Sequence, residues 1–563
     1  MVKKIRNLIP LFLIFISIVP ITQALLPAGF FKTHDGTHHM VRLMHFYDEL
    51  SRGQFPVRIA VDMANGFGSP VFNYFYPLFY YLGSLFHFLR FTYGGSLKLV
   101  IYLATLGSGF SMYWWLRGYF GRVSSMIGAI VYLYAPYRLG TLYVTGQYGA
   151  TLAFFFVPLL LASIDRYLVK KSFLGFVVIA LSTFGLITSH NISVVIFAIP
   201  LALYIGLKLV ETKSLKEKLL PFGTSFLLGI GLSAFFLLPA VLELPLIHIG
   251  RHEVFDFRQH WPTFRQLVYS SWGYWYSVPG PNDGMSFQVG GVQWLVVVMS
   301  AVCLFYRLLR EQLRRKDRSA FLFLGIFWVT VFLMQPQSEP VWAFISLFSH
   351  VQFPWRFLAV TVLSCAFLAS WVVSLVGSKV AKLVLVTFIL AVAFYSNRNY
   401  LRTFEPVRYS DDYYVHDTGL YYGTTDVAGE SLPIWVDKVP ETCGVNADAC
   451  LGYQMVNFRA VGDLTTFEVT TKSPQLLQAM RFYFPLWQVL VDGQPVETFP
   501  IGTGGLLGFP VQPGKHLVEV RLNSTPIERI GNSLSLISLG LIIVISVKML
   551  RRHLLSMGPY KNV

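Results

Sequence analysis

Residues 8–25, LIPLFLIFISIVPITQAL, form an uncharged apolar run that follows the basic residues Lys3, Lys4 and Arg6. A helix needs about 20 apolar residues to cross a bilayer, so this run predicts a membrane-spanning helix. The basic start is also typical of a signal peptide. No clear small-residue cleavage site follows, however, and we interpret the run as a retained first helix.

The composition of the whole chain also indicates a membrane protein. Of its 563 residues, 54% are hydrophobic and 13% are charged, which is typical of a polytopic α-helical membrane protein. The net charge of +16 would also suit a nucleic-acid-binding protein, but Lys and Arg are spread over short loops between apolar runs. Basic residues in such loops set membrane topology. We therefore exclude nucleic acid and expect membrane lipids as partners.

The basic loops predict the topology, because an excess of Lys and Arg stays in the cytoplasm. With the N- and C-termini in the cytoplasm and every basic cluster on that side, about twelve spans are needed. We expect them near residues 8–26, 97–116, 123–139, 149–165, 172–188, 192–209, 221–240, 291–306, 319–335, 355–376, 380–396 and 529–549. The polar loops then face outward, and so does any chemistry that they carry.

This count requires that the hydrophobic stretch Val71–Phe91 does not cross the membrane. The stretch contains Pro77, and its Tyr and Phe residues are of the kind that lies at the headgroup level. We expect a helix that lies in the outer interface or dips partly into it. The alternative is a spanning helix, with an error elsewhere in the count.

The topology divides the chain into three parts. Residues 1–396 form the transmembrane domain, with a large first outer loop at 28–96, and residues 529–563 form the last helix and a cytoplasmic tail. Residues 397–528 form an extracytoplasmic domain. Its latter half alternates apolar and polar residues, and the Asp-Gly pair at residue 492 is a strong hairpin signal. We expect a β-sandwich there.

The cysteines divide between these parts. Cys443 and Cys450 both fall in the outward domain, where surroundings are oxidising, and we expect a disulfide between them. Cys303 and Cys365 lie in apolar spans, where cysteine packs as a small apolar residue.

The most informative polar segment is HDGTHH, residues 34–39, just outside the first span. An acidic residue with histidines at the mouth of a membrane protein suits a group that activates a substrate. If a helix begins after Asp35, then Asp35, His38 and Arg42 share one face. Two alternatives stay open. Asp35 is a preferred N-cap residue, and Asp35 with His34, His38 or His39 has the spacing of divalent-metal ligands.

Several motifs resemble those of a known family. They are Asp35-Gly36 within residues 34–83, Ser189-His190-Asn191, Gln352-Phe353-Pro354-Trp355-Arg356 and Tyr483-Phe484-Pro485-Leu486-Trp487. Together they resemble the membrane proteins labelled "6-pyruvoyl-tetrahydropterin synthase-related", a label that does not imply pterin chemistry. The last motif is also similar to the YfhO-like membrane proteins. The resemblance spans almost the whole chain, and the motif at 352–356 is its most specific element.

These families resemble the GT-C glycosyltransferases, which have many helices, an acidic residue in the first outer loop, and polyprenyl-phosphate-linked sugars as donors. The resemblance therefore implies a GT-C-like fold. One departure lies at residues 144–150, where the family pattern favours Arg-Gly followed by Glu and this chain has neither charge.

The resemblance implies Asp35 as the general base that takes the proton of an acceptor hydroxyl. Cations would stabilise the departing lipid phosphate, and the candidates are Arg58, His190 and Arg356. His34, His38 and His39 are further candidates for substrate contact. The alternatives are an Arg356 that extends to the lipid headgroups and a His190 that only packs between helices.

The function implied is a cell-envelope glycosyltransferase. It would transfer a sugar from a polyprenyl-phosphate-linked donor to a glycan, lipid or protein acceptor on the extracytoplasmic face. No cofactor is certain, and a divalent metal ion at Asp35 and His39 is the alternative to a metal-free site. The alternative functions are a non-catalytic membrane protein that transports or scaffolds lipid-linked glycans, and a lipid-linked glycan polymerase or ligase.

Overall fold

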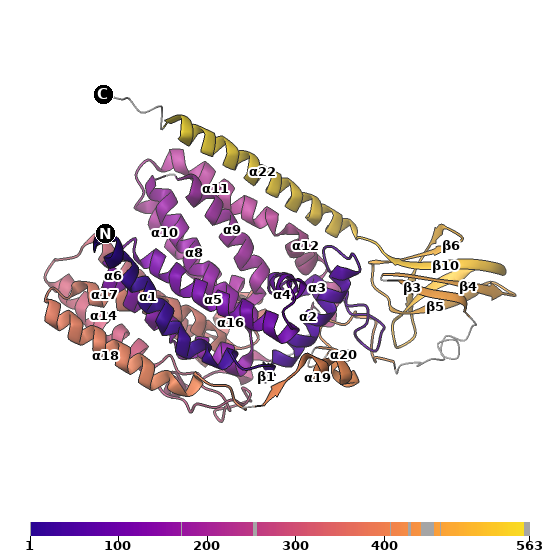
Figure 1. The fold of residues 1–563 in the computed structure, drawn as a ribbon, viewed down its shortest axis with the longest axis horizontal. Coiled ribbons are helices and arrows are strands. Elements are labelled where there is room, and N and C mark those ends of the chain that lie inside the picture. Colours follow the sequence, from indigo (N-terminus) through magenta and orange to yellow (C-terminus); the bar gives the residue numbers. More distant parts are fainter. Residues whose placement is uncertain are drawn as a thin grey trace.

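The structure is a computed structural model that describes residues 2–170, 172–250, 256–405, 407–425, 429–440, 455–461 and 463–556. A helical body and a β domain lie end to end (Figure 1). Both termini lie at the end of the helical body that is remote from the β domain, and α22 runs back along the body from one end to the other (Figure 1).

The helical body is built from apolar helices joined by short loops and short helices. Its helices are α1 (Val2–Thr22), α2 (Gly36–Ser51), α3 (Val71–Tyr74), α4 (Leu78–Phe88), α5 (Tyr93–Leu116), α6 (Arg122–Leu133), α7 (Pro136–Gly140), α8 (Tyr148–Lys170), α9 (Phe173–Ser189), α10 (Asn191–Val210), α11 (Leu215–Leu232), α12 (Ala234–Leu242), α13 (Phe264–Val268), α14 (Gly291–Leu309), α15 (Arg315–Leu333), α16 (Glu339–Phe344), α17 (Leu358–Leu375), α18 (Lys379–Asn397), α19 (Asp411–His416), α20 (Thr418–Tyr421) and α22 (Pro526–Ser556).

Among the described residues, eight helices are long and apolar enough to cross a membrane. The number rises to ten if each of two bent pairs is one span: α11 with α12, bent by 69°, and α15 with α16, bent by 94°. Two shorter apolar helices are α6 and α9. Every span expected from the sequence overlaps one of these helices, but the span expected at 123–139 is broken after Leu133, where α6 ends. The chain is therefore a helical membrane protein, while the total of about twelve spans stays a prediction.

Residues 71–91 do not form one continuous helix. Helix α3 ends at Tyr74, and α4 begins at Leu78, directly after Pro77. Neither helix approaches the length of about 20 residues that a bilayer requires. Instead, α4 packs against α2 and α5. The expectation of one interfacial helix over residues 71–91 is therefore wrong, whereas the expectation that this stretch does not cross the membrane stays a prediction.

The β domain contains two antiparallel sheets, with strand orders β3-β4-β10-β6-β7 and β5-β9-β8. The strands are β3 (Val456–Val461), β4 (Leu464–Thr471), β5 (Gln475–Phe482), β6 (Trp487–Val491), β7 (Gln494–Val496), β8 (Phe499–Ile501), β9 (Leu506–Val511) and β10 (Gly514–Leu522). Asp492 and Gly493 both have positive φ in the β6–β7 turn, as the sequence predicts. The finer description as a β-sandwich stays a prediction, and Cys443 and Cys450 lie outside the described residues.

Residues near the start of the chain contact residues that follow α18. Strand β1 (Phe30–Phe31) pairs with β2 (Arg408–Tyr409). In the first outer loop, Phe67 O accepts a 2.8 Å hydrogen bond from Phe482 N. Ile59 of the same loop belongs to the apolar cluster of the β domain. The first outer loop and the β domain therefore fold against each other.

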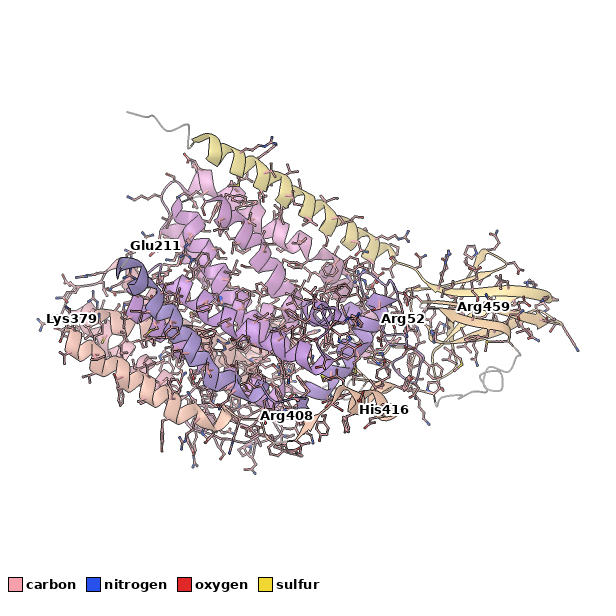
Figure 2. The ribbon with its side chains drawn as sticks, viewed as in Figure 1. Arg52, Glu211, Lys379, Arg408, His416 and Arg459 are labelled. Atoms are coloured by element: carbon pink, nitrogen blue, oxygen red, sulfur yellow. The ribbon has the colours of Figure 1, made fainter. Side chains whose placement is uncertain are left out.

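This arrangement generates a topology prediction. Lys379 and Glu211 lie toward the end with the termini, whereas Arg52, His416 and Arg459 lie toward the other end (Figure 2). We expect a membrane-impermeant maleimide to label His416→Cys in intact cells, and Lys379→Cys only after permeabilisation, because both positions are exposed. Labelling of the unsubstituted protein gives the background. The reverse labelling pattern would contradict the proposed orientation.

Candidate active site at the start of helix α2

The loop before α2 is held against the segment that precedes α8. His34 N donates to Val144 O at 2.9 Å, and Asp35 N donates to Thr145 O at 3.0 Å. Gly146 has a φ of 73°, and a Cβ at this position would lie 2.2 Å from Thr33 Oγ1. Only glycine combines this φ with so close an approach. The stretch in which the sequence departs from the family pattern thus fixes the position of Asp35.

Asp35 occupies the N-cap position of α2, but its side chain makes no capping hydrogen bond. Within the described residues, its carboxylate accepts no hydrogen bond at all, although it is half-buried. Burial raises the pKa of Asp35, and the positive charges of Arg42 and Arg356 act in the opposite direction. The interpretation of Asp35 as a simple N-cap residue therefore lacks the bond that would define it.

Arg42 lies two turns after Asp35 on α2 and is held in place on two sides. Its Nε donates to Thr425 Oγ1 and its Nη2 to Thr425 O, both at 2.8 Å. Its guanidinium lies 3.8 Å from the centre of the Phe75 ring. These contacts keep a fixed positive charge near Asp35.

Arg356 comes from a short helical turn at Pro354–Phe357, directly before α17. Its Nη1 donates to Val351 O and to Gln352 Oε1, both at 2.8 Å. Its Nε is buried and has no hydrogen-bond partner among the described residues. A buried donor without a partner is costly, and a ligand oxygen would satisfy it.

Two histidines lie beside these charges, and both are neutral near pH 7. Burial, with the nearby charge of Arg356, lowers the pKa of His190 to about 3. Its Nδ1 accepts from Ser193 N at 3.2 Å, so the remaining proton is assigned to Nε2. Burial also lowers the pKa of His39, with Arg42, His38 and His190 adding to the effect. His39 Nδ1 lies 2.8 Å from Tyr80 Oη.

Tyr76 completes the group, which we call the Asp35 cluster: Asp35, His39, Arg42, Tyr76, His190 and Arg356. The Tyr76 ring lies 5.2 Å from that of His190. Burial raises the pKa of Tyr76 well above its usual value, and the charges of Arg42, Asp35 and Arg356 also act on it. The sequence suggested Tyr76 only as an interfacial aromatic residue, and Arg42 only as a member of the polar helix face. The cluster of Tyr and Phe residues around Pro77 was the one signal for Tyr76.

The remaining candidate residues lie apart from this cluster or at its edge. His34 Nε2 lies 3.1 Å from Tyr274 O, and its ring lies 4.2 Å from the Tyr276 ring. His38 is near enough for its charge to act on His39. Arg58 belongs to a different network, in which its Nη1 donates to Asn73 Oδ1 at 3.0 Å. The structure therefore does not place Arg58 beside Asp35.

The metal-ligand interpretation of the HDGTHH segment does not fit this geometry. No group of three His, Cys, Asp or Glu side chains that could hold a metal ion exists among the described residues. His34 and His39 are directed to Tyr274 and Tyr80.

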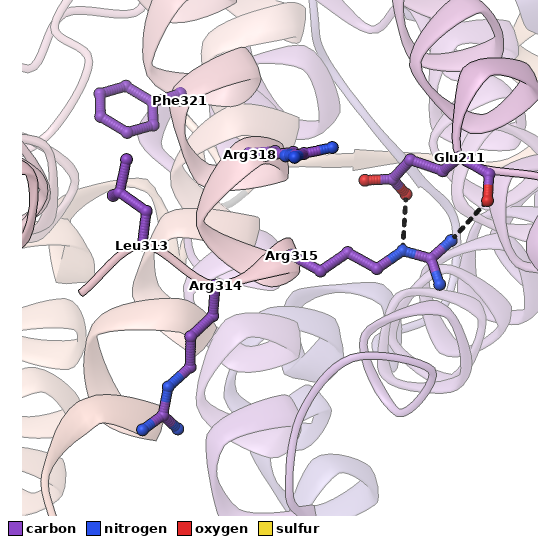
Figure 3. A pocket seen from close by; sticks show the side chains of 6 residues that line it. All are labelled: Glu211, Leu313, Arg314, Arg315, Arg318 and Phe321. Carbon is purple, nitrogen blue, oxygen red and sulfur yellow. Dashed lines mark hydrogen bonds and ion pairs between the residues drawn. The ribbon is translucent and has the colours of Figure 1, made fainter. Parts of the chain in front are cut away.

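A pocket of about 470 Å³ lies far from this cluster, on the side of the termini. It is lined by Glu211, Leu313, Arg314, Arg315, Arg318 and Phe321 (Figure 3). Arg315 Nε pairs with Glu211 Oε2 at 3.3 Å across it. Exposed arginines in short loops between apolar helices are common in membrane proteins, so we assign this pocket no substrate.

Comparison with known proteins gives distant similarities. No family model matches the chain, and the family resemblance stays a prediction. A region of 250 residues is 25% identical to an uncharacterized protein of Lactococcus lactis subsp. cremoris and covers 43% of this chain and 41% of that protein. The structure is similar to the apo oligosaccharyltransferase of Archaeoglobus fulgidus, with a TM-score of 0.43 and 14% identity. That match covers 72% of this chain and 57% of the other.

The missing capping bond generates a stability prediction. We expect Asp35→Ala to unfold at a temperature no lower than the wild type in detergent, because it removes a half-buried charge and no hydrogen bond. The matched control is Thr92→Ala. Thr92 Oγ1 accepts from Gly95 N at 3.0 Å at the start of α5, and losing such a cap costs about 0.5–2 kcal/mol. A comparable loss in both variants would restore the N-cap interpretation.

Proposed function

We propose that this protein is a membrane glycosyltransferase that works on the extracytoplasmic face. It transfers a sugar from a polyprenyl-phosphate-linked donor to a hydroxyl of a glycan, lipid or protein acceptor. The observation that carries the proposal is the Asp35 carboxylate, which is half-buried, accepts no hydrogen bond within the described residues, and is flanked by two arginines. Leaving a carboxylate in this state is costly, and function is the usual reason for such a cost.

The proposed reaction needs one proton acceptor. The acceptor oxygen forms a bond to the anomeric carbon while the bond from that carbon to the lipid phosphate oxygen breaks. The proton of the attacking hydroxyl passes to Asp35, and the lipid phosphate leaves with the electron pair. Burial raises the pKa of Asp35 and so makes it a stronger proton acceptor than an exposed aspartate.

The cations of the Asp35 cluster suit the leaving phosphate. Arg356 has a buried Nε with no partner within the described part of the chain, and a phosphate oxygen would accept from it. His190 is neutral, so its Nε2–H offers a hydrogen bond rather than a charge. Arg42 is already engaged with Thr425 and Phe75, and we assign it the positioning of Asp35.

The proposal includes the finer topology. About twelve spans would place both termini in the cytoplasm, and the Asp35 cluster and the β domain outside. The β domain, which we propose to be a sandwich, lies against the first outer loop that carries Asp35. It is therefore positioned to help bind the acceptor.

The decisive test is Asp35→Asn. The amide keeps the shape of the side chain but does not accept a proton at neutral pH, and loss of a general base costs about 10²–10⁴-fold in rate. We expect the sugar addition to disappear from the cellular glycans, as measured by comparative mass spectrometry. Asp412→Asn, an exposed aspartate of α19, is the matched control and should leave the glycans unchanged.

Two other outcomes of this test favour the alternative functions. Unchanged glycans in a folded and inserted Asp35→Asn protein would favour a transporting or scaffolding role. Transfer of whole blocks rather than single residues would favour a polymerase or ligase.

The electrostatics of Asp35 generate a pH prediction. A base must be deprotonated, so kcat/KM should fall as the pH drops through the raised pKa of Asp35. Arg42→Gln removes a positive charge that lowers this pKa, and the acid limb should move to higher pH. Arg42→Lys keeps the charge, and its acid limb should stay in place. If the acid limb of kcat/KM lies at the same pH in Arg42→Gln and in Arg42→Lys, Asp35 is not the titrating base.

A further inference from the structure

A second pocket lies where the first outer loop, the β domain and α22 meet. Its volume is about 220 Å³. It is lined by Gln54, Phe55, Pro56 and Arg58 of the loop, Leu486, Leu522, Asn523 and Ser524 of the β domain, and Glu528 and Asn532 of α22. Three segments far apart in the sequence thus build one small polar pocket, separate from the Asp35 cluster.

Arg58 is the fixed wall of this pocket. Its Nη1 donates to Asn73 Oδ1 at 3.0 Å, and its Nη2 donates to Phe235 O at 2.6 Å. Nη2 also donates to Asn532 Oδ1 at 3.2 Å. The guanidinium is buried and its two terminal nitrogens are engaged, so it holds the wall in shape.

The unsatisfied carboxylate of Glu528 indicates that the pocket binds a ligand. Its side chain is 1% exposed, and its Oε2 accepts from Thr525 N at 3.2 Å. Its Oε1 lies 3.7 Å from Arg58 Nε, which is too far for a hydrogen bond, and it accepts none from any described residue. A buried carboxylate oxygen requires hydrogen-bond donors. Glu528 belongs to the pocket lining, so a ligand with an O–H group would supply one once the side chain turns toward the pocket.

The charge of the pocket restricts the ligand further. Arg58 and Glu528 are its two ionisable side chains, and they carry opposite charges when Glu528 is ionised. An anion would meet the carboxylate, and a cation would meet the guanidinium, so a neutral ligand is favoured. Asn532 uses its oxygen for Arg58 and keeps its amide N–H groups available within the described structure. The pocket therefore offers both an acceptor and donors, which suits hydroxyl groups.

The apolar part of the pocket suits a ring. Phe55 is 76% exposed, an unusual exposure for a large aromatic side chain. Pro56 and Leu486 lie on the same lining. The volume of about 220 Å³ lies below the range of about 300–1,000 Å³ typical of sites for drug-sized ligands, so a small ligand such as one sugar ring is favoured.

We propose that this pocket binds one neutral sugar unit of the substrate, with Phe55 against the ring and Glu528 accepting from a hydroxyl. The proposal rests on the proposed transferase function and adds a recognition subsite to it. The subsite is separate from the reacting atoms. It recognises a sugar that is carried by the donor or by the acceptor.

The test is a saturation-transfer NMR titration of the full-length protein in detergent. The probes are the methyl glycosides of glucose, galactose, mannose and N-acetylglucosamine, and triethylene glycol is the negative control. We expect at least one glycoside to bind, and Phe55→Ala to raise its Kd by about tenfold or more. Phe344→Ala, another exposed phenylalanine outside the pocket, should leave the Kd unchanged.

A second variant tests the buried carboxylate. Glu528→Gln keeps an oxygen for Thr525 N but turns an N–H group toward the pocket, so it should also raise the Kd. Absence of binding by all four glycosides, or equal Kd values for the wild type and both variants, would overturn the subsite.

These outcomes are independent of those for Asp35. If Asp35→Asn keeps glycoside binding but loses transfer, both proposals stand. If Asp35→Asn keeps transfer while Phe55→Ala loses binding, the subsite stands and the assignment of Asp35 fails.

Discussion

The site depends on the contact between the loop before α2 and the segment before α8. Two backbone hydrogen bonds, from His34 N and Asp35 N, join these segments. The close approach at Gly146 leaves no room for a side chain. Backbone groups hold their position more rigidly than flexible side chains do, so Asp35 starts from a fixed point. Without this contact, the Asp35 carboxylate would have no defined relation to Arg356, which lies on a distant part of the chain.

The fixed backbone explains how the protein keeps an unsatisfied carboxylate. Burial disfavours the charged form of Asp35, and the two arginines compensate only in part. Arg42 and Arg356 are themselves anchored, by Thr425 and by Val351 and Gln352. Neither can swing over to form a close ion pair without breaking those bonds. The Asp35 carboxylate is therefore left without a close partner and is available to a substrate. The stability of the rest of the fold offsets the free energy that this arrangement costs.

The sequence predicted the helices well, because each apolar run carries its own signal. The break in residues 71–91 was not predicted, although Pro77, which cannot continue a helix from Tyr74, carried the signal for it. Asp35, His39, His190 and Arg356 were named from local motifs and do come together. Arg58 was named in the same way and does not join them. Its partner Asn532 lies hundreds of residues away, and no local pattern reports such a pairing.

The same long-range network connects the two candidate sites. Asn73 accepts from Arg58 and donates through Nδ2 to Glu243 Oε2 at 2.8 Å. Glu243 Oε1 accepts in turn from Thr525 Oγ1 at the start of α22. Asn73 lies in α3, three residues before Tyr76 of the Asp35 cluster. A ligand that engages Glu528 would change the charge that Arg58 faces, and through the Arg58–Asn73 hydrogen bond it would act on the short helix that leads into Tyr76. Since buried polar networks respond as a unit, a ligand in the pocket lined by Arg58 and Glu528 and the geometry at Asp35 should be coupled.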